Sequence, residues 1–230
     1  MKITKNKKKL IENIDVSKVY EPIEAIKILK ENSFTKFEEA LEVAINLGID
    51  TNKTDQNIRG VISLPKGTGK KINVAVLAKG EKLNEASEAG ADLVGETDLV
   101  ESISAGKINF DLLIATPDMM PAIGKVAKIL GPKGLMPNPK LGSVTEDLKT
   151  AVSNAKSGQA EIRNDKDGNI GVSIGKKSFN DDQLVKNFNA IVDTLDKEKS
   201  NNTLKGDLIK NTFVTSSMGV SYKVKLGKSI

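Results

Sequence analysis

The stretch KINVAVLA, residues Lys71–Ala78, is a short apolar run, and a helical stretch, GEKLNEASEAGA, follows it directly. The same alternation recurs downstream, where the apolar runs ADLVG and FDLLIAT (Phe110–Thr116) are each followed by a helix-like segment. Short apolar strands separated by helices are typical of a small, mostly parallel sheet with helices on both faces. The middle of the chain is therefore predicted to be an α/β domain.

Two of the expected helices begin with capping signals. Thr116 precedes Pro117, which suits a first helical position because its missing N–H is not needed there. We therefore expect Thr116 to cap the helix PDMMPAIGKVAKIL. Asn180 and Gln183 form a capping-box-like start to a second helix, DDQLVKNFNAIVDTLDKEK.

The two ends of the chain have a different pattern. EPIEAIKILKEN predicts an amphipathic helix with Ile23, Ile26 and Leu29 on one side. The segment Phe37–Leu47, FEEALEVAINL, alternates from Phe37 onward as a half-buried antiparallel strand does. The segment Glu161–Gly175, EIRNDKDGNIGVSIG, predicts a hairpin, because a polar turn joins two alternating runs.

These patterns predict an α+β split domain, an antiparallel sheet with helices, formed by residues 1–66 and 160–230. An inserted Rossmann-like three-layer α/β domain occupies residues 67–159. The insert holds 11 lysines and 11 acids, so the formal charge of +5 and seven of the eight aromatic residues belong to the split domain. The crossings at 64–69 and 155–160 predict a two-stranded hinge.

Composition excludes several classes of function. The chain has no cysteine and no histidine, which rules out disulfides, thiolate metal sites and imidazole catalysis. We expect no cofactor and no metal ion. No apolar run approaches the roughly 18 residues of a membrane helix, and the N-terminus lacks the features of a signal peptide, so we expect a cytoplasmic protein without membrane contact.

Two glycine- and lysine-rich loops resemble phosphate-binding loops without meeting the requirements. GTGKK, at 67–71, lacks the first glycine and the final Ser or Thr of a Walker motif, and it precedes a strand, so a boundary turn is the better interpretation. GPKGLMPNPK, at 131–140, has three prolines that remove N–H donors. It is predicted to be a stiff surface loop, with phosphate contact by Lys133 or Lys140 the weaker alternative.

Positive charge gathers at the N-terminus, in Lys2, Lys5 and the run 7–9, and the sequence pI is about 9.1. These features favour a polyanion as partner. Near the C-terminus, TSSMG (Thr215–Gly219) interrupts two good strands with hydroxyls, a Met and a Gly. A bulge with satisfied hydroxyls and a binding site explain this segment equally well.

Three segments in order along the chain then carry a resemblance: FEEALEVAINLGIDTNKTDQNIRGVISLPKGTGK, GPKGLMPNPKLGSV and FVTSSMG. Together they closely resemble the bacterial-type ribosomal protein L-one family, the first protein of the large ribosomal subunit. The resemblance implies a non-enzymatic constituent of that subunit that binds large-subunit ribosomal RNA at the mobile stalk and assists release of deacylated tRNA from the exit site. It further implies translational repression through binding to its own operon mRNA, and a monomer off the ribosome.

The resemblance also implies which positions contact RNA. In this sequence they are Lys36, Phe37, Glu42, Arg163, Asp165, Lys166, Thr215, Ser216, Ser217, Met218 and Gly219. Lys and Arg would position phosphates, hydroxyls and Glu42 would contact 2′-OH and base groups, and Phe37 and Met218 would pack on sugars or unstacked bases. Ala40 lacks the hydroxyl, and Val220 the rigidity, of the Thr and Pro that are common at these positions in relatives.

Two rival functions stand beside this one. The first is a nucleotide-binding enzyme built on the inserted α/β domain, against which the missing nucleotide motifs and the absence of histidine count. The second is nonspecific DNA binding through the basic surface.

Overall fold

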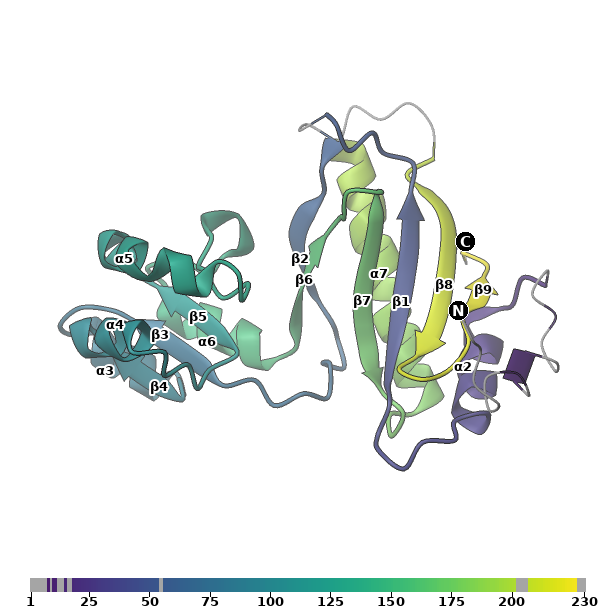
Figure 1. Ribbon diagram of the computed structural model, residues 1–230, viewed down its shortest axis with the longest axis horizontal. Coiled ribbons are helices and arrows are strands. Elements are labelled where there is room, and N and C mark those ends of the chain that lie inside the picture. The colour runs from purple at the N-terminus through teal and green to yellow at the C-terminus, as the bar shows by residue number, and fades with distance from the viewer. Residues whose placement is uncertain are drawn as a thin grey trace. The chain divides into compact units, whose positions relative to one another are not determined.

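The computed structural model describes residues 18–53, 56–201 and 207–226, together with Lys8, Leu10, Ile11 and Asp15. The chain divides into two compact units, both visible in Figure 1. The split unit comprises Met1–Gly69 and Ala160–Ile230, and the continuous unit comprises Lys70–Gln159. The N-terminal residues Lys2, Lys5, Lys7 and Lys9 lie outside the described residues, whereas Lys8 is exposed.

The split unit holds a four-stranded antiparallel sheet in the order β7-β1-β8-β9 and a separate pair, β2-β6. Helices α2 and α7 belong to the same unit. The bounds are α2 (Pro22–Glu31), β1 (Ala40–Leu47), β2 (Arg59–Ser63), β6 (Gln159–Arg163), β7 (Asn169–Lys176), α7 (Asp181–Asn201), β8 (Ile209–Ser216) and β9 (Tyr222–Val224).

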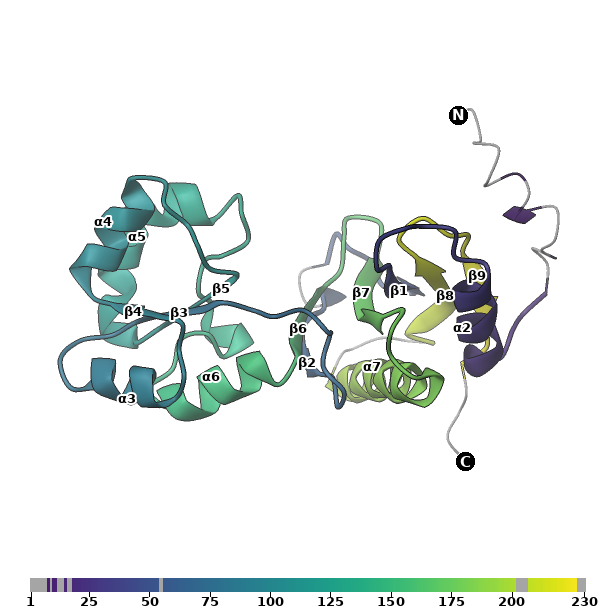
Figure 2. The ribbon, with the colours of Figure 1, turned by 90° about the horizontal axis from the view of Figure 1, so that it is seen from below.

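Strand β1 is central to this sheet because it pairs with both β7 and β8. Its residues alternate: Leu41, Val43, Ile45 and Leu47 are buried in the core of the unit. Helix α7 covers this face of the sheet, as Figure 2 shows, and among the described residues no helix lies over the opposite face. An antiparallel sheet with one face on the core and one toward solvent produces this alternation.

Two residues differ from the predicted pattern. Phe37 lies before β1 and is 56 % exposed, so it does not continue the buried side of the strand. In α2, Ile26 and Leu29 are buried as predicted, but Ile23 in the first turn is exposed. Phe37 precedes the first residue of β1, and Ile23 lies in the first turn of α2. At the start of an element, fewer core residues are available to cover a side chain.

The predicted hairpin at Glu161–Gly175 is wrong. Its polar turn forms, but β6 and β7 belong to different sheets, β6 with β2 and β7 with β1. The side chain of Asn164 explains the divergence, since its Oδ1 accepts the Ile58 N–H at 2.8 Å and so fastens the chain before the turn to the β2 segment. Beyond the turn, the Leu47 N–H donates to the Gly168 carbonyl and joins β7 to β1.

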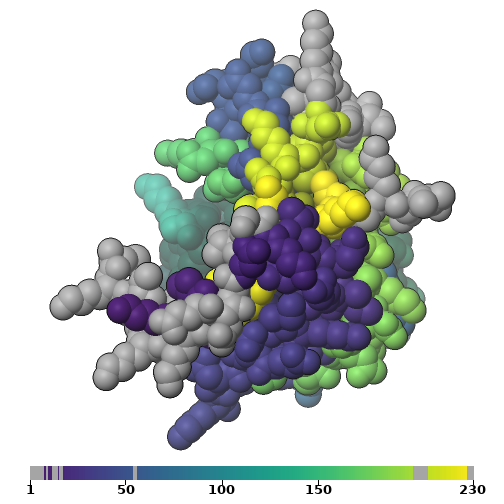
Figure 3. All heavy atoms as spheres, turned by 90° about the vertical axis from the view of Figure 1, so that its right-hand side faces the viewer, coloured from purple at the N-terminus to yellow at the C-terminus, as the bar shows by residue number. Residues whose placement is uncertain are grey.

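The outer edge of the sheet is extended by the segment before α2. Tyr20 forms a bridge with Val224 of β9, and its N–H donates to the Lys223 carbonyl at 2.9 Å. The Tyr20 and Tyr222 rings meet edge to face with their centroids 5.4 Å apart. Figure 3 shows this N-terminal segment, in purple, lying against the yellow C-terminal strands.

The continuous unit is built on a three-stranded parallel sheet in the order β4-β3-β5. Val74 and Val76 of β3 are buried with α3 and α6, and Ala75 and Leu77 are buried with α4 and α5 (Figure 2). The structure confirms the predicted combination of an antiparallel and a parallel sheet. The bounds are β3 (Val74–Leu77), α3 (Lys82–Glu88), β4 (Leu93–Gly95), α4 (Thr97–Ser104), β5 (Leu112–Ala115), η2 (Pro117–Met119), α5 (Met120–Leu130), η3 (Pro139–Leu141) and α6 (Leu148–Lys156).

The two predicted helix caps have different outcomes. Gln183 Oε1 accepts the Asn180 N–H at 3.0 Å, which confirms one half of the capping box. Thr116 occupies the predicted N-cap position, with Pro117 at the start of η2, but its side chain makes no capping hydrogen bond. Its N–H donates to the Leu77 carbonyl as a continuation of β5, so its side chain is buried, and among the described residues its hydroxyl has no hydrogen-bond partner.

In the described ranges, no helix combines the length and apolar character needed to cross a membrane.

Candidate functional site

The helix-free face of the four-stranded sheet presents a row of polar side chains. Glu42 of β1 is exposed and lies in register with Ser173 of β7 on one side and Thr215 of β8 on the other. Directly opposed residues in an antiparallel sheet have Cβ atoms roughly 5 Å apart, so these three side chains are neighbours. Ala44 is next along the same face, and it pairs with Gly171 of β7 on one side and with Phe213 of β8 on the other.

At the start of β1, two segments far apart in sequence are tied together. The Ala40 N–H donates to Ser217 Oγ at 3.2 Å, and the Ser217 N–H donates to the Ala40 carbonyl at 3.1 Å. The Met218 N–H donates to Glu39 Oε1 at 3.0 Å, and the Gly219 N–H donates to the Ser216 carbonyl at 3.1 Å. The segment after β8 is therefore held at the beginning of β1.

This arrangement exposes a cation, an aromatic ring, a hydroxyl and a thioether near one end of the sheet. Lys36 and Ser217 are exposed, Phe37 is 56 % exposed and Met218 is 52 % exposed. Phe34 is also exposed, in the same loop. Exposed apolar side chains beside a cation are suited to unstacked bases and sugars flanked by phosphate.

Ser216 and Gly219 have structural surroundings. Ser216 is 5 % exposed, and it pairs with Leu41, whose side chain is in the core. A Cβ on Gly219 would lie 2.4 Å from Ser216 Oγ, so another residue here would force the Ser216 hydroxyl to move. In this structure the Ser216 side chain is not part of the exposed surface.

Of the predicted residues, Arg163 ends β6, and Asp165 and Lys166 lie in the turn between β6 and β7; all three are exposed. The Asp165 carboxylate makes its hydrogen bonds within this turn. Oδ1 accepts the N–H groups of Asp167 at 2.9 Å and Asn169 at 2.7 Å, and Oδ2 accepts from Asn169 Nδ2 at 3.2 Å. These bonds, the one from the Asn169 N–H foremost, hold the pKa of Asp165 below its usual value.

The structure thus separates the predicted residues into two groups. The strand-start group consists of Lys36, Phe37, Glu42 and Thr215–Gly219, and the turn group of Arg163, Asp165 and Lys166. Ala40 pairs with Lys176 at one end of β1, whereas Asn46 pairs with Asn169, next to the turn group, at the other. At about 3.4 Å per residue, the groups are roughly 20 Å apart along the strand. Only an extended ligand could contact both.

Sequence reasoning missed Glu39, Phe34 and Ser173. Glu39 falls on the buried side of the alternation that starts at Phe37, so its position in an apolar series was the available signal. Phe34 stands two residues before Lys36, and an aromatic close to a lysine could have been noted. Ser173 could not have been found, because its place beside Glu42 depends on the register between β7 and β1.

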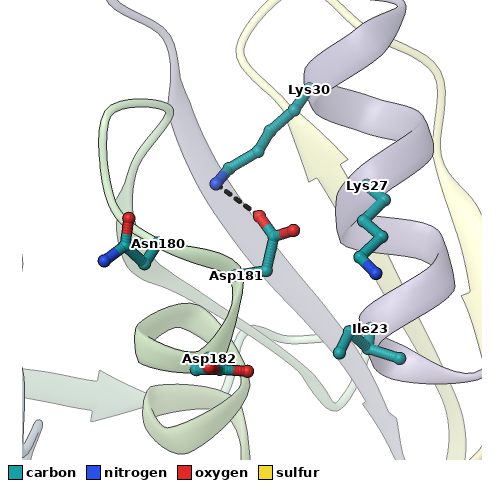
Figure 4. A pocket seen from close by; sticks show the side chains of 6 residues that line it. All are labelled: Ile23, Lys27, Lys30, Asn180, Asp181 and Asp182. Carbon is teal, nitrogen blue, oxygen red and sulfur yellow. Dashed lines mark hydrogen bonds and ion pairs between the residues drawn. The ribbon is translucent and has the colours of Figure 1, made fainter.

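A surface depression of about 400 Å³ lies between α2 and α7. Figure 4 shows that it is lined by Ile23, Lys27, Lys30, Asn180, Asp181 and Asp182. Lys30 Nζ donates to Asp181 Oδ1 at 2.6 Å, so this lysine and this carboxylate neutralise each other. The contact joins the two helices. In the part of the chain that the structure describes, no group of three or more carboxylates is placed to hold a metal ion.

The two glycine-rich loops have structural partners of their own. Lys70 Nζ donates to Asp111 Oδ1 at 2.6 Å, and this bond, with one from the Asn73 N–H, lowers the pKa of Asp111. In the loop at 131–140, Ser143 Oγ accepts the Asn138 N–H at 2.8 Å and donates to its carbonyl at 3.1 Å. These bonds brace the loop, and Lys133 and Lys140 remain exposed.

Comparison with known proteins identifies the family. Residues 29–220 match the family described as "Ribosomal protein L1p/L10e family". The chain is 65 % identical over 202 residues to the protein named large ribosomal subunit protein uL1 of Pelagibacter ubique (strain HTCC1062), covering 88 % of each chain. It is 52 % identical over 215 residues to the protein of that name from Rickettsia peacockii (strain Rustic), covering 94 % of this chain and 90 % of the relative. With the protein of that name from Prochlorococcus marinus (strain NATL1A) the identity is 51 % over 209 residues, covering 91 % and 88 %. The chain therefore belongs to the ribosomal protein L1p/L10e family.

Proposed function

We propose that the chain is a structural constituent of the large ribosomal subunit that binds large-subunit ribosomal RNA at the mobile stalk. The observation that carries this proposal is the strand-start group, where Lys36, Phe37 and Met218 are exposed beside the helix-free face of a sheet. The names of the relatives, which place them in the large subunit, support the same conclusion.

The exposed residues contact different parts of the RNA according to their chemistry. Lys36, Arg163 and Lys166 contact phosphates, because a charged donor suits an oxyanion. Glu42, Thr215 and Ser217 accept from or donate to 2′-OH and base groups in unpaired RNA. Phe37 and Met218 pack against sugars or unstacked bases. The separation of the strand-start and turn groups suits a structured RNA that spans the sheet.

Two residues of the expected site act through the backbone in this proposal. Asp165 shapes the turn that carries Lys166 and follows Arg163, because both of its carboxylate oxygens are engaged within the turn. Ser216 supports the close approach at Gly219, because its side chain is buried.

The remaining functions concern the continuous unit and other RNAs. We assign the continuous unit as a Rossmann-like three-layer domain, residues 67–159. This domain is inserted in an RNA-binding α+β domain, residues 1–66 and 160–230. Motion at the two crossings accompanies release of deacylated tRNA from the exit site. The same RNA site binds the chain's own operon mRNA and represses its translation. In this proposal the protein is a cytoplasmic, ribosome-bound non-enzyme without a cofactor, and a monomer off the ribosome.

The test is RNA binding by the purified full chain across a salt series. The three ligands are a large-subunit ribosomal RNA fragment that carries the stalk, an unrelated structured RNA and a mixed-sequence duplex DNA. We expect tight binding to the stalk fragment alone at physiological salt. Equal, salt-sensitive binding to all three ligands would contradict the proposal, because only phosphate contacts would then be at work.

A further inference from the structure

Glu39 is a buried acid next to the strand-start group. It is 1 % exposed, and its Oε1 accepts the Met218 N–H at 3.0 Å. Its Oε2 is buried, and within the described residues it has no hydrogen-bond partner. No lysine or arginine of the described ranges forms an ion pair with it.

A carboxylate in this position is unfavourable in two respects. Burial of an acidic group without a cation is costly. The group also lies directly beneath a surface proposed to receive a polyanion, which it would repel. The residue must therefore do something at this position that an apolar side chain could not do.

The N–H groups of the three residues after Ser216 show which role a polar side chain at Glu39 has. The Ser217 N–H donates to the Ala40 carbonyl and the Gly219 N–H donates to the Ser216 carbonyl, so both use the backbone. The Met218 N–H between them has Glu39 as its acceptor. Without that side chain the N–H would lack a partner, and the segment would have to turn it toward water.

We propose that Glu39 is a positioning residue for RNA recognition, an inference that rests on the proposed RNA-binding function. Its carboxylate orients the Met218 peptide so that the Ser217 and Met218 side chains stand exposed before RNA arrives. Because the segment is already ordered in the free protein, RNA binding does not include the entropic cost of ordering it. Glu39 itself stays beneath the surface and does not contact RNA.

Two conservative variants distinguish the effect of the side-chain length at position 39 from the effect of its charge. Glu39→Gln keeps an acceptor oxygen at the same reach and removes the charge, whereas Glu39→Asp keeps the charge and is one methylene group too short. We expect Glu39→Gln to bind the stalk RNA fragment within about threefold of the wild type and Glu39→Asp to bind about tenfold more weakly. The exposed neighbour Glu38 supplies matched controls, and Glu38→Gln and Glu38→Asp should both bind at least as well as the wild type.

A second measurement reports the hydrogen bond directly. Hydrogen exchange of the Met218 amide in the free protein should be at least about tenfold faster in Glu39→Asp than in Glu39→Gln or the wild type. A uniform loss of stability would accelerate exchange across the whole split unit, so thermal unfolding of each variant is measured alongside.

The outcomes distinguish the two levels of the proposal. Equal binding by folded wild type, Glu39→Gln and Glu39→Asp overturns the positioning role, as does the reverse order, which would indicate simple electrostatics. If Glu39→Asp does not fold, a tenfold loss in folded Glu39→Gln overturns it, and retained binding with a protected Met218 amide supports it. If the wild type shows no preference for the stalk RNA, the proposed function fails, while amide exchange still decides whether Glu39 orders the segment.

Discussion

At the scale of single residues, exposure decides which predicted positions can meet a ligand. Met218 and Phe37 are large apolar side chains that stand in solvent, whereas Ser216, next but one to Met218, is buried. Ser216 is the last residue of β8 and lies on its buried side with Thr212 and Val214. Phe37 and Met218 lie outside β1 and β8, in loops, and their side chains are exposed.

The clearest prediction at this scale concerns Met218. Met218→Asp replaces an apolar contact by a negative charge beside phosphates, and we expect stalk RNA affinity to fall at least about tenfold, or about 1.4 kcal/mol. Unfolding should be unaffected, because the side chain is already half exposed. Ser217→Ala should weaken binding in the same direction.

Met136→Asp is the matched control, since Met136 is an exposed methionine in the loop at 131–140 of the continuous unit. Filter binding or fluorescence anisotropy measures all three variants. A folded Met218→Asp that binds as well as Met136→Asp would remove Met218 from the site.

At the scale of elements, the residues that form a turn do not determine which strands pair on either side of it. The polar turn before β7 forms as its Asp, Asn and Gly residues require, with Gly168 at a φ of 77°. The strands on either side of it nevertheless join different sheets, because Asn164 binds the β2 segment and β1 accepts β7. Thr116 shows the same competition, since strand burial prevails over helix capping.

The turn before β7 should make a pH-dependent contribution through Asp165. Its folded pKa lies below its ordinary value of about 3.9, so the contribution is complete above that ordinary value and is lost as pH falls through the folded pKa. Asp165→Asn keeps an acceptor at Oδ1 but has no charge. We expect it to be less stable than the wild type at pH 7 and to differ less at pH 3.

Urea unfolding of the full chain at both pH values measures this difference. Asp167→Asn, a change of an exposed acid two residues away, is the control and should show no such convergence. A wild-type advantage over Asp165→Asn that is the same at pH 7 and pH 3 would contradict the prediction.

At the scale of the whole molecule, one buried amide fastens the first crossing between the two units to the split unit. Asn187 of α7 is buried, and its Oδ1 accepts the Lys66 N–H at 3.0 Å. Its Nδ2 donates to the carbonyls of Gly67 at 2.9 Å and Ile174 at 2.8 Å. The chain is therefore held by the split unit up to Gly67.

Loss of this amide should be costly. Asn187→Ala leaves one N–H and two carbonyl groups without their partner, and we expect the free energy of unfolding of the split unit to fall by about 2–4 kcal/mol. Asn189→Ala, an exposed change two residues later in α7, should cost less than about 1 kcal/mol. Denaturant unfolding followed by circular dichroism measures both, and equal stability of the two variants would show that the crossing is fastened in another way.

The sequence by itself determined the elements and the family. Alternating apolar residues from Leu41 to Leu47 required a half-buried strand, and the short apolar runs separated by helices required a parallel sheet, because burial follows the period of the backbone. The segments FEEALEVAINLGIDTNKTDQNIRGVISLPKGTGK, GPKGLMPNPKLGSV and FVTSSMG were enough to indicate the family that the comparisons then showed.

Only the tertiary structure decided which residues stand together. The register of β1 with β7 and β8 places Ser173 and Thr215 beside Glu42, and it places the turn group at the far end of the strand. The bond from Met218 to Glu39 joins residues that are 179 positions apart. Such pairings depend on long-range packing and chain closure, which no local pattern of residues encodes.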